Sequence, residues 1–383
     1  MATTVYPYTQ YSGIWSLAGQ ANAKALTTWP NQPEPKLYAW GSSGGGALGL
    51  GNTTSYSSPK QVGSLANWEN VGCGNDFTIA TKLDKTLWSW GNNSEGSLGL
   101  GNTTYYSSPK QVGSSITWGS IATRGYSVIA LQDNGTLYAW GRNTDGQLGL
   151  GNTTGRSSPV QVGALTAWSK IASGGPHTLA IKTDGTLWSW GRNGSGQLGL
   201  GNLTYYSSPK QVGALTNWSK ITGGSNFTAA VKTDGTLWTF GMNSSGQLGL
   251  GNTTYYSSPK QVGALTAWIQ VAAGQTCVWA VKTDGTLWSW GNNASGQLGL
   301  GDTTSRSSPV QVGALTTWSK IFGSNNNIAS IKTDGTLWTW GNNSGGQLGF
   351  GNTTNYSSPK QVGALINWLN ADTGNFTIAI LSQ

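Results

Sequence analysis

The fold of this chain is constrained above all by a repeat whose copies end in an aromatic residue followed by glycine. These pairs recur every fifty residues, at Trp40-Gly41, Trp90-Gly91, Trp140-Gly141, Trp190-Gly191, Phe240-Gly241, Trp290-Gly291 and Trp340-Gly341. A fixed period of this length is typical of a stacked or radial array of one supersecondary unit. Most of the 383 residues therefore belong to one repetitive domain.

Each copy predicts four short antiparallel strands. In the copy at residues 159–191 we expect strands at 159–162, 169–172, 178–182 and 186–191. Asp184-Gly185 between the last two is a hairpin signal, because a tight two-residue turn needs the positive φ that Asp and Gly tolerate. Seven such units predict an all-β fold, a seven-bladed β-propeller with four-stranded antiparallel blades.

The two ends of the repetitive domain, residues 36–383, complement each other. The domain begins with the last strand of a copy, at residues 37–40, and its final copy stops after the preceding strand, at residues 377–380. Pairing these strands in one blade would close the ring and remove exposed sheet edges. Residues 1–35 do not match the repeat and are interpreted as an N-terminal leader that docks or attaches.

The composition favours a packed β protein without catalytic machinery. Each copy carries a tryptophan expected to pack within its blade, at Trp68, Trp118, Trp168, Trp218, Trp268, Trp318 and Trp368. One histidine and two cysteines, Cys73 and Cys277, provide no metal cluster and no nucleophile with its base, so we expect neither an enzyme nor a cofactor. The cysteines are predicted to be small core residues.

No export signal and no membrane span are predicted. The first residues have no basic and apolar regions of the Sec type, and no apolar stretch is long enough to cross a bilayer. The net charge of +8 permits an anionic partner. Nucleic acid is disfavoured, because its binding surfaces usually carry denser runs of Lys and Arg.

The repeat resembles that of the regulator of chromosome condensation family. Units such as SSPVQVGALTAWSKIASGGPHTLAIKTDGTLWSWGRNGSGQLGLGN combine the Gly-x-x-His-Thr segment, the Asp-Gly turn, the Trp-Gly pair and the Gly-Gln-Leu-Gly run of that family. The resemblance spans residues 36–383 and implies a seven-bladed propeller. For function it implies several classes, which include a nucleotide-exchange factor for a small GTPase, ubiquitin-ligase modules and β-lactamase inhibitors.

Two features depart from the eukaryotic members of that family. The copies are nearly identical to one another, and no long inserted loop of the kind that enters a GTPase is present, which argues against nucleotide exchange. The near-identical repeats and the leader also look similar to structural proteins of tailed phages.

Comparison of the copies within the chain points to one variable segment in each, between two predicted strands. We expect these segments to bind a partner, since functional residues favour loops on a rigid scaffold, although loops also drift freely. The candidate residues are Asn75, Asp76, Phe77, Arg124, Tyr126, Pro176, His177, Asn226, Phe227, Gln275, Asn325, Asn326, Asn375 and Phe376.

A ring of basic residues is predicted beside these segments. Connections in an up-and-down blade alternate between two faces, so the variable segment should share a face with the long loop after Trp-Gly. We assign to that loop Tyr106 and one cation per copy, although such cations can also serve solubility alone. The cations are Lys60, Lys110, Arg156, Lys210, Lys260, Arg306 and Lys360.

Two hypotheses for function follow. The first is a recognition and structural protein, a phage virion appendage or surface protein, which binds a protein or host-surface glycan through the loop-rich face. Residues 1–35 would contact other virion proteins, and the location would be the virion or cell surface without a Sec signal. The alternative is a cytoplasmic protein-interaction regulator, either inhibitor-like or similar to a GTPase exchange factor.

Overall fold

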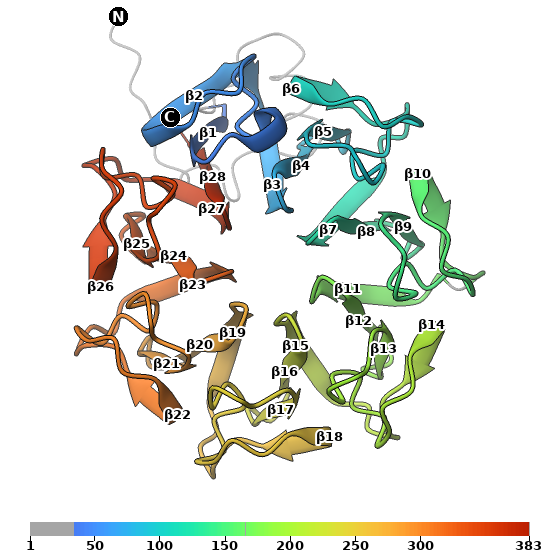
Figure 1. Ribbon diagram of the computed structural model, residues 1–383, viewed down its shortest axis with the longest axis vertical. Helices are drawn as coiled ribbons and strands as arrows, with labels where there is room; N and C mark the ends of the chain where they lie inside the picture. The colour runs from blue at the N-terminus through green and yellow to red at the C-terminus, as the bar shows by residue number, and fades with distance from the viewer. Residues whose placement is uncertain (1–33, 165, 383) are drawn as a thin grey trace, which may run out of the picture. The chain divides into compact units, whose positions relative to one another are not determined.

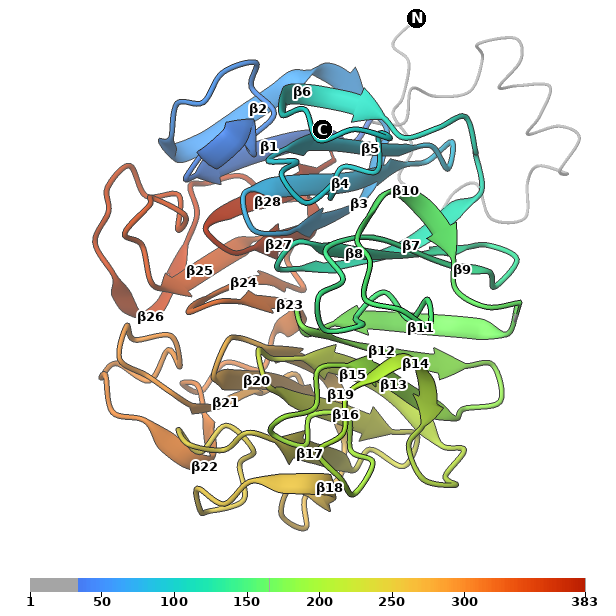
Figure 2. The same ribbon diagram turned by 45° about the vertical axis from the view of Figure 1, so that its right-hand side comes forward.

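The computed structural model describes residues 34–164 and 166–382, and these form seven four-stranded sheets arranged around a central axis (Figure 1). The leader assigned to residues 1–35 therefore lies almost wholly outside the described residues. In the oblique view of Figure 2, most strands lie roughly across the picture, and neighbouring strands are antiparallel. The prediction of a seven-bladed β-propeller is confirmed.

We number the blades from the first complete one along the chain. Blade 1 contains β3 (Trp68–Cys73), β4 (Phe77–Lys82), β5 (Leu87–Gly91) and β6 (Tyr106–Gln111); blade 2 contains β7 (Trp118–Arg124), β8 (Ser127–Gln132), β9 (Leu137–Gly141) and β10 (Arg156–Gln161); blade 3 contains β11 (Trp168–Ser173), β12 (His177–Lys182), β13 (Leu187–Gly191) and β14 (Tyr206–Gln211). Blade 4 contains β15 (Trp218–Gly223), β16 (Phe227–Lys232), β17 (Leu237–Gly241) and β18 (Tyr256–Gln261). Blade 5 contains β19 (Trp268–Ala273), β20 (Cys277–Lys282), β21 (Leu287–Gly291) and β22 (Arg306–Gln311); blade 6 contains β23 (Trp318–Ser324), β24 (Asn327–Lys332), β25 (Leu337–Gly341) and β26 (Tyr356–Gln361).

Blade 7 joins the two ends of the described chain. It contains β27 (Trp368–Thr373) and β28 (Phe376–Leu381) from the C-terminal end, followed by β1 (Lys36–Gly41) and β2 (Tyr56–Ala66) from the N-terminal end. A short 3-10 helix, η2 (Gly44–Gly46), lies between β1 and β2. Strands β1 and β28 pair antiparallel, with Leu37 opposite Ile380 and Trp40 opposite Thr377. The predicted closure of the ring is confirmed.

The boundaries of a blade differ from those of the predicted unit by one strand. The strand expected at residues 159–162 is part of β10, which pairs with β9 and forms the outer strand of the preceding blade. The innermost strand of each blade is the one that begins with tryptophan (Figure 1). For the same reason each end of the chain contributes two strands to blade 7, where the sequence pattern had predicted a single N-terminal strand.

Each blade is packed around three aromatic side chains. The tryptophan that begins each innermost strand is buried, as predicted, and in blade 3 the ring of Trp168 lies 5.9 Å from that of Trp188 and 6.0 Å from that of Trp190. The ammonium of Lys182 lies 3.8 Å from the centroid of Trp188. Burying one such ring contributes up to roughly 4 to 6 kcal/mol to folding.

The Trp-Gly pair of one blade holds the Gly-Gln-Leu-Gly run of the preceding blade. Trp190 donates a hydrogen bond from Nε1 to the carbonyl oxygen of Gln147 at 3.0 Å. Gly149 has a φ of +73°, and a Cβ there would lie 2.7 Å from Nε1 of Trp190, so a side chain is excluded at this position. This contact explains why both motifs recur together in the sequence.

Candidate functional site

The variable segments and the long loops share one face of the propeller. Strand order puts both connections at the same end of each blade, and the residue after each Trp-Gly pair donates to a carbonyl of the variable segment. In blade 3, for example, the backbone N–H of Arg192 donates to Pro176 at 2.9 Å. The predicted pairing of these two connections is correct, and we call this end of the ring the variable face.

Neighbouring variable segments are hydrogen-bonded to one another across the blade boundaries. The side-chain amide of Gln275 donates to Asn325 at 3.4 Å, Asn325 donates to Asn375 at 3.0 Å, and Asn375 donates to the carboxylate of Asp76 at 3.4 Å. These four residues, which we call the amide arc, come from blades 5, 6, 7 and 1. The structure thus brings four predicted residues together into one polar surface.

Other surface candidates contact either the neighbouring blade or the long loop of their own blade. The side chain of Asn226 accepts a hydrogen bond from Gln197 at 3.3 Å, and the N–H of Asn75 donates to Gly125 at 2.7 Å. The backbone carbonyls of Tyr126 and Asn326 accept from Arg142 and Asn342. All four residues are partly exposed, so they remain available to a partner.

The aromatic and imidazole side chains among the candidates lie in the interior. Phe77, His177, Phe227 and Phe376 have no exposed surface, because each ring packs beneath its own loop. A Cβ on Gly174 would lie 2.0 Å from the ring of His177, so glycine is what lets the loop cover the ring. These four side chains cannot contact a partner on the variable face, contrary to the sequence prediction.

His177 is an uncharged core residue. Its Nε2 lies 3.1 Å from Oγ1 of Thr228, and its Nδ1 has no partner among the described residues. Burial, with a smaller effect from the charge of Arg124, lowers the pKa of His177 to about 3. The imidazole is therefore neutral at pH 7 and is shielded from any surface ligand.

Arg124 was expected to contact a partner at the surface, but it lies in the interior. It is buried, and its Nη1 reaches across the central axis to the carbonyl oxygens of Gly223, at 2.7 Å, and Ala273, at 3.0 Å. Burial lowers its pKa to about 10, so the guanidinium stays charged at pH 7. Arg124 connects blade 2 to blades 4 and 5 and is not a surface contact.

The sequence analysis did not predict a role for Asp372, a partly buried carboxylate. Asp372 accepts hydrogen bonds from the N–H groups of Cys73, at 2.7 Å, and Thr373, at 2.9 Å. Burial raises its pKa to about 6. Comparison of the copies could have found it, since the equivalent positions hold Gly72, Ala122 and Ala172.

The cysteines behave as predicted. Both Cys73 and Cys277 are buried and unpaired, and burial raises the pKa of Cys277 to about 12. No group of three His, Cys, Asp or Glu side chains that could hold a metal ion occurs in residues 34–164 and 166–382. Within the same residues, no helix is long and apolar enough to span a bilayer.

The predicted cations lie on the outermost strands, at two different heights: Lys60, Lys110, Arg156, Lys210, Lys260, Arg306 and Lys360. The lysines lie within these strands, on the outer wall of the propeller, and Lys110 lies 5.4 Å from the ring centroid of Tyr106. Arg156 and Arg306 are the first residues of their strands and contact the long loop as predicted: Arg156 donates to Gly155 at 3.1 Å, and Arg306 forms a 2.7 Å ion pair with Asp302. The lysines are not in the loop because the outermost strand begins earlier than the sequence pattern suggested.

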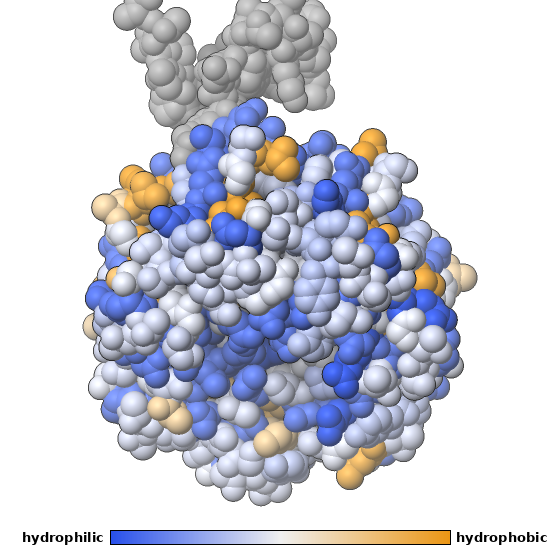
Figure 3. Space-filling model, turned by 45° about the horizontal axis from the view of Figure 1, so that its top comes forward, coloured by the Kyte–Doolittle hydropathy of each residue, from blue (hydrophilic) through white to orange (hydrophobic). Residues whose placement is uncertain are grey.

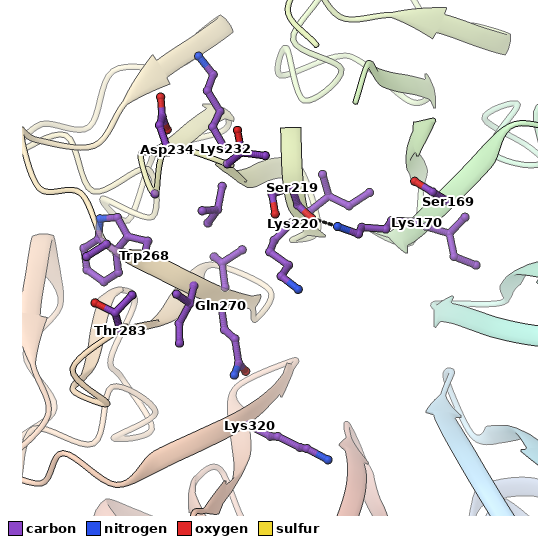
Figure 4. A pocket seen from close by; sticks show the side chains of 18 of the residues that line it. Ser169, Lys170, Ser219, Lys220, Lys232, Asp234, Trp268, Gln270, Thr283 and Lys320 are labelled. Carbon is purple, nitrogen blue, oxygen red and sulfur yellow. Dashed lines mark hydrogen bonds between the residues drawn. The ribbon is translucent and has the colours of Figure 1, made fainter. Parts of the chain in front are cut away.

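A pocket of about 940 Å³ lies at the central axis on the opposite end of the ring. We call this end the turn face, because it holds the Asp-Gly turns and the loops between blades. Lys170, Lys220, Gln270 and Lys320 line it from four different blades, and the side chain of Lys170 extends to Ser219 of the next blade (Figure 4). We did not predict a site at these residues from the sequence, although lysine recurs in the third position of three Trp-initiated strands.

These features define a class of protein: a closed seven-bladed propeller with variable loops at one end of the ring and a lysine-lined pocket at the other. The RCC1-like domain model matches residues 26–270, and the regulator of chromosome condensation (RCC1) repeat model matches residues 284–330 and 334–380. The chain belongs to the RCC1-like domain family. The resemblance noted in the sequence is thereby confirmed.

Solved structures of the same architecture share the fold at low identity. Yeast RCC1 (Prp20) bound to Kap60 has a TM-score of 0.81 at 20% identity, covering 91% of this chain and 89% of that one. Human WBSCR16 has a TM-score of 0.82 at 21% identity, covering 91% and 99%. Prp20p from Saccharomyces cerevisiae, reported with its binding properties to Gsp1p and histones, has a TM-score of 0.79 at 20% identity, covering 91% and 92%. The comparison with curated proteins gives no match.

Proposed function

We propose that the chain is a non-catalytic protein-interaction propeller that binds a protein partner through its variable face. The observation that carries this proposal is the amide arc. Its residues differ from copy to copy, while the scaffold beneath them repeats, and they lie side by side on one exposed surface. Polar side chains held on a rigid ring offer a partner fixed hydrogen-bonding groups at little entropic cost.

The family favours a regulator of proteins over the virion hypothesis. Yeast RCC1 has been crystallised with Kap60, and Prp20p has been studied with Gsp1p and histones, so related propellers bind proteins. No phage or glycan-binding protein appears among the relatives reported above. The proposed role is therefore the alternative drawn from the sequence, an RCC1-like interaction module, with the identity of the partner left to experiment.

The surface chemistry agrees with a polar recognition face. The surface seen in Figure 3 is largely hydrophilic, with hydrophobic side chains scattered near its outer edge. The exposed tyrosines Tyr105, Tyr205 and Tyr255 precede the outermost strands, away from the amide arc. A partner would gain hydrogen bonds at the centre of the face and aromatic contacts toward its edge.

The test is a binding experiment with a matched control. The full chain would be used to isolate a partner from its native source, and the complex would then be rebuilt from purified proteins for calorimetry. We expect Asn325→Ala with Asn375→Ala to weaken the complex at least about tenfold, which corresponds to about 1.4 kcal/mol. The pair Lys110→Gln with Lys210→Gln, on the outer wall, should leave it unchanged.

Two outcomes would count against the proposal. Unchanged affinity in the Asn325→Ala, Asn375→Ala protein would remove the variable face from the interaction. Loss of binding in the outer-wall control would move the interface to the perimeter. Should the partner be a small GTPase, release of a fluorescent nucleotide from it would decide whether the complex also catalyses exchange.

A further inference from the structure

The pocket on the turn face is built by the innermost strands of several blades. Its lining runs from Ser120 of blade 2 to Lys320 of blade 6 and includes the Asp-Gly turn at Asp234. It therefore lies across the central axis, on the opposite side of the ring from the amide arc. The volume of about 940 Å³ is in the range of pockets that accept ligands or short peptide segments.

Three lysines from three blades line this pocket. Lys170, Lys220 and Lys320 occupy equivalent positions on β11, β15 and β23, and all three side chains are exposed. In the part of the chain that the structure describes, none of them forms an ion pair. Burial, with a smaller effect from the charge of Lys220, lowers the pKa of Lys170, so these two neighbouring cations repel each other.

The structure does not require positive charge at these positions. Lys170 donates to the carbonyl oxygen of Ser219 in the next blade at 2.5 Å, and Lys320 donates likewise to Leu369 at 2.6 Å. At the equivalent position of blade 5, the neutral side chain of Gln270 makes the same bond to Ser319. A neutral amide therefore suffices to join neighbouring blades.

Asparagine makes equivalent contacts elsewhere in the ring. Asn70 donates to Gly119 at 3.3 Å, and Asn370 donates to the carbonyl oxygen of Glu69 at 3.3 Å. Since glutamine and asparagine satisfy the interblade bond, the lysines bring repulsion that packing does not explain. An anionic ligand would relieve that repulsion.

The carboxylates nearest to the pocket are occupied within their own turns. Asp234 accepts two hydrogen bonds from Thr236, at 2.9 Å from the N–H and 2.6 Å from Oγ1. Its charge is balanced by Lys232, the neighbour two residues before it, whose ammonium lies over Trp238. On the far side of the ring, Glu69 is paired with Lys85 at 2.9 Å. Among the described residues, no carboxylate forms an ion pair with the three lysines.

Exposed apolar side chains occur in the pocket and farther out on the same face. Ile269 lines the pocket itself and is 40% exposed. Leu215, in a loop that joins two blades, lines a separate pocket beside the outer strands with Gln211 and Pro259. Exposed leucine or isoleucine side chains recur where successive blades join, at Leu65 near the end of β2 and in the loops at Ile116, Leu265, Leu315, Leu365 and Ile366. A soluble surface rarely repeats large apolar residues in this way unless they contact another molecule.

We propose that the pocket formed by Lys170, Lys220 and Lys320 binds an acidic segment of a protein, with the carboxylates at the centre and leucine-type side chains on the surrounding loops. A peptide supplies both chemistries, whereas nucleic acid supplies phosphates and bases. Single-stranded nucleic acids bind best where bases stack on exposed aromatic rings. The large hydrophobic residues exposed on the described turn face are aliphatic, and the exposed tyrosines precede the outer strands at the variable face.

The test replaces charge without removing the interblade bonds. The full chain carrying Lys170→Gln, Lys220→Gln and Lys320→Gln would be compared with one carrying Lys110→Gln, Lys210→Gln and Lys260→Gln on the outer wall. Both variants lose three positive charges, so long-range electrostatics change equally. The probe is a fluorescent peptide composed of glutamate and leucine. Two further probes are compared with it: a peptide in which glutamine replaces each glutamate, and a short single-stranded DNA.

We expect the glutamate peptide to bind the natural chain in a salt-dependent manner and to bind the pocket variant at least about tenfold more weakly. The outer-wall variant should retain its affinity, and the glutamine peptide should bind poorly. Equal loss in both variants would reduce the effect to net charge and overturn the proposal. A preference for DNA over the glutamate peptide through the same lysines would also overturn it, in favour of a nucleic-acid site.

Loss of folding is excluded by a second measurement. The unfolding midpoint of neither variant should fall below that of the natural chain, and relief of the repulsion should if anything raise that of the pocket variant. Lys220→Gln alone should already weaken peptide binding. Unchanged peptide binding in that single variant and in the triple variant would refute the assignment. The pocket and the amide arc lie on opposite faces, so failure of one proposal leaves the other intact.

Discussion

The same Trp→Phe substitution should have different costs in two blades, because the indole has a second donor beside it in only one of them. Trp190 and Trp290 are both fully buried, and their Nε1 atoms lie 3.0 Å from the carbonyl oxygens of Gln147 and Gln247. The carbonyl of Gln147 also accepts a hydrogen bond from Oγ1 of Thr178 at 2.7 Å. At the corresponding place in blade 5 stands Val278, which has no hydroxyl.

The magnitudes follow from this difference. In both blades the smaller ring costs about 1 to 2 kcal/mol in packing, and the lost hydrogen bond costs about 1 kcal/mol. Trp190→Phe should therefore destabilise the protein by roughly 2 to 3 kcal/mol. Trp290→Phe also leaves the carbonyl of Gln247 buried without a donor among the described residues, which adds about 1 to 3 kcal/mol.

The assay is urea unfolding of both variants and of the natural chain, followed by circular dichroism. Reintroducing the hydroxyl through Val278→Thr in the Trp290→Phe background should recover part of the extra loss. Equal destabilisation by the two tryptophan substitutions would refute the argument that the second donor protects the carbonyl. So would the absence of any recovery on adding the threonine.

Two further predictions concern glycine and the carboxylate of Asp372. Gly149→Ala and Gly163→Ala both place alanine at positive φ, but only the Cβ added at Gly149 would meet an indole, at 2.7 Å. Calorimetry should therefore show a loss of stability of about 1 to 2 kcal/mol for Gly163→Ala and at least twice that loss for Gly149→Ala. Equal losses would contradict the contact. The raised pKa of Asp372, about 6 against 3.8, means that the folded state holds the proton more tightly than the unfolded one. The stability that this proton contributes is present below pH 4 and is lost as the pH rises through 6, by up to roughly 3 kcal/mol. Asp372→Asn should flatten the stability curve between these pH values, and an unchanged curve would show that Asp372 titrates normally.

Much of the fold could be predicted because every copy repeats the same local signals. The Asp-Gly turns, the Trp-initiated strands and the complementary ends indicated four-stranded blades in a closed ring, and the structure has them. The assignment of the strand at residues 159–162 to its blade failed. Local pattern gives the existence of that strand, whereas its partner depends on the loop after Trp140-Gly141, which turns the chain back onto β9.

The candidate site was predicted only in part. Variation among copies correctly located the segments that form the amide arc, because side chains on a loop are free to differ when the scaffold beneath them is fixed. Variation could not separate exposed residues from buried ones. Phe77 and His177 differ between copies because they fill slightly different spaces under the loops, and that space is set by neighbouring blades.

The sequence by itself determined the number of blades, the turns and the closure of the ring, since these depend on a period and on contacts between adjacent segments. Only the tertiary structure decided which side chains meet across the central axis. Arg124 reaches Ala273, 149 residues away, and Lys170, Lys220 and Lys320 line one pocket from three blades. Such contacts arise because closure of the ring brings the innermost strands of distant copies together around the central axis. No local pattern in the chain specifies which of their side chains meet.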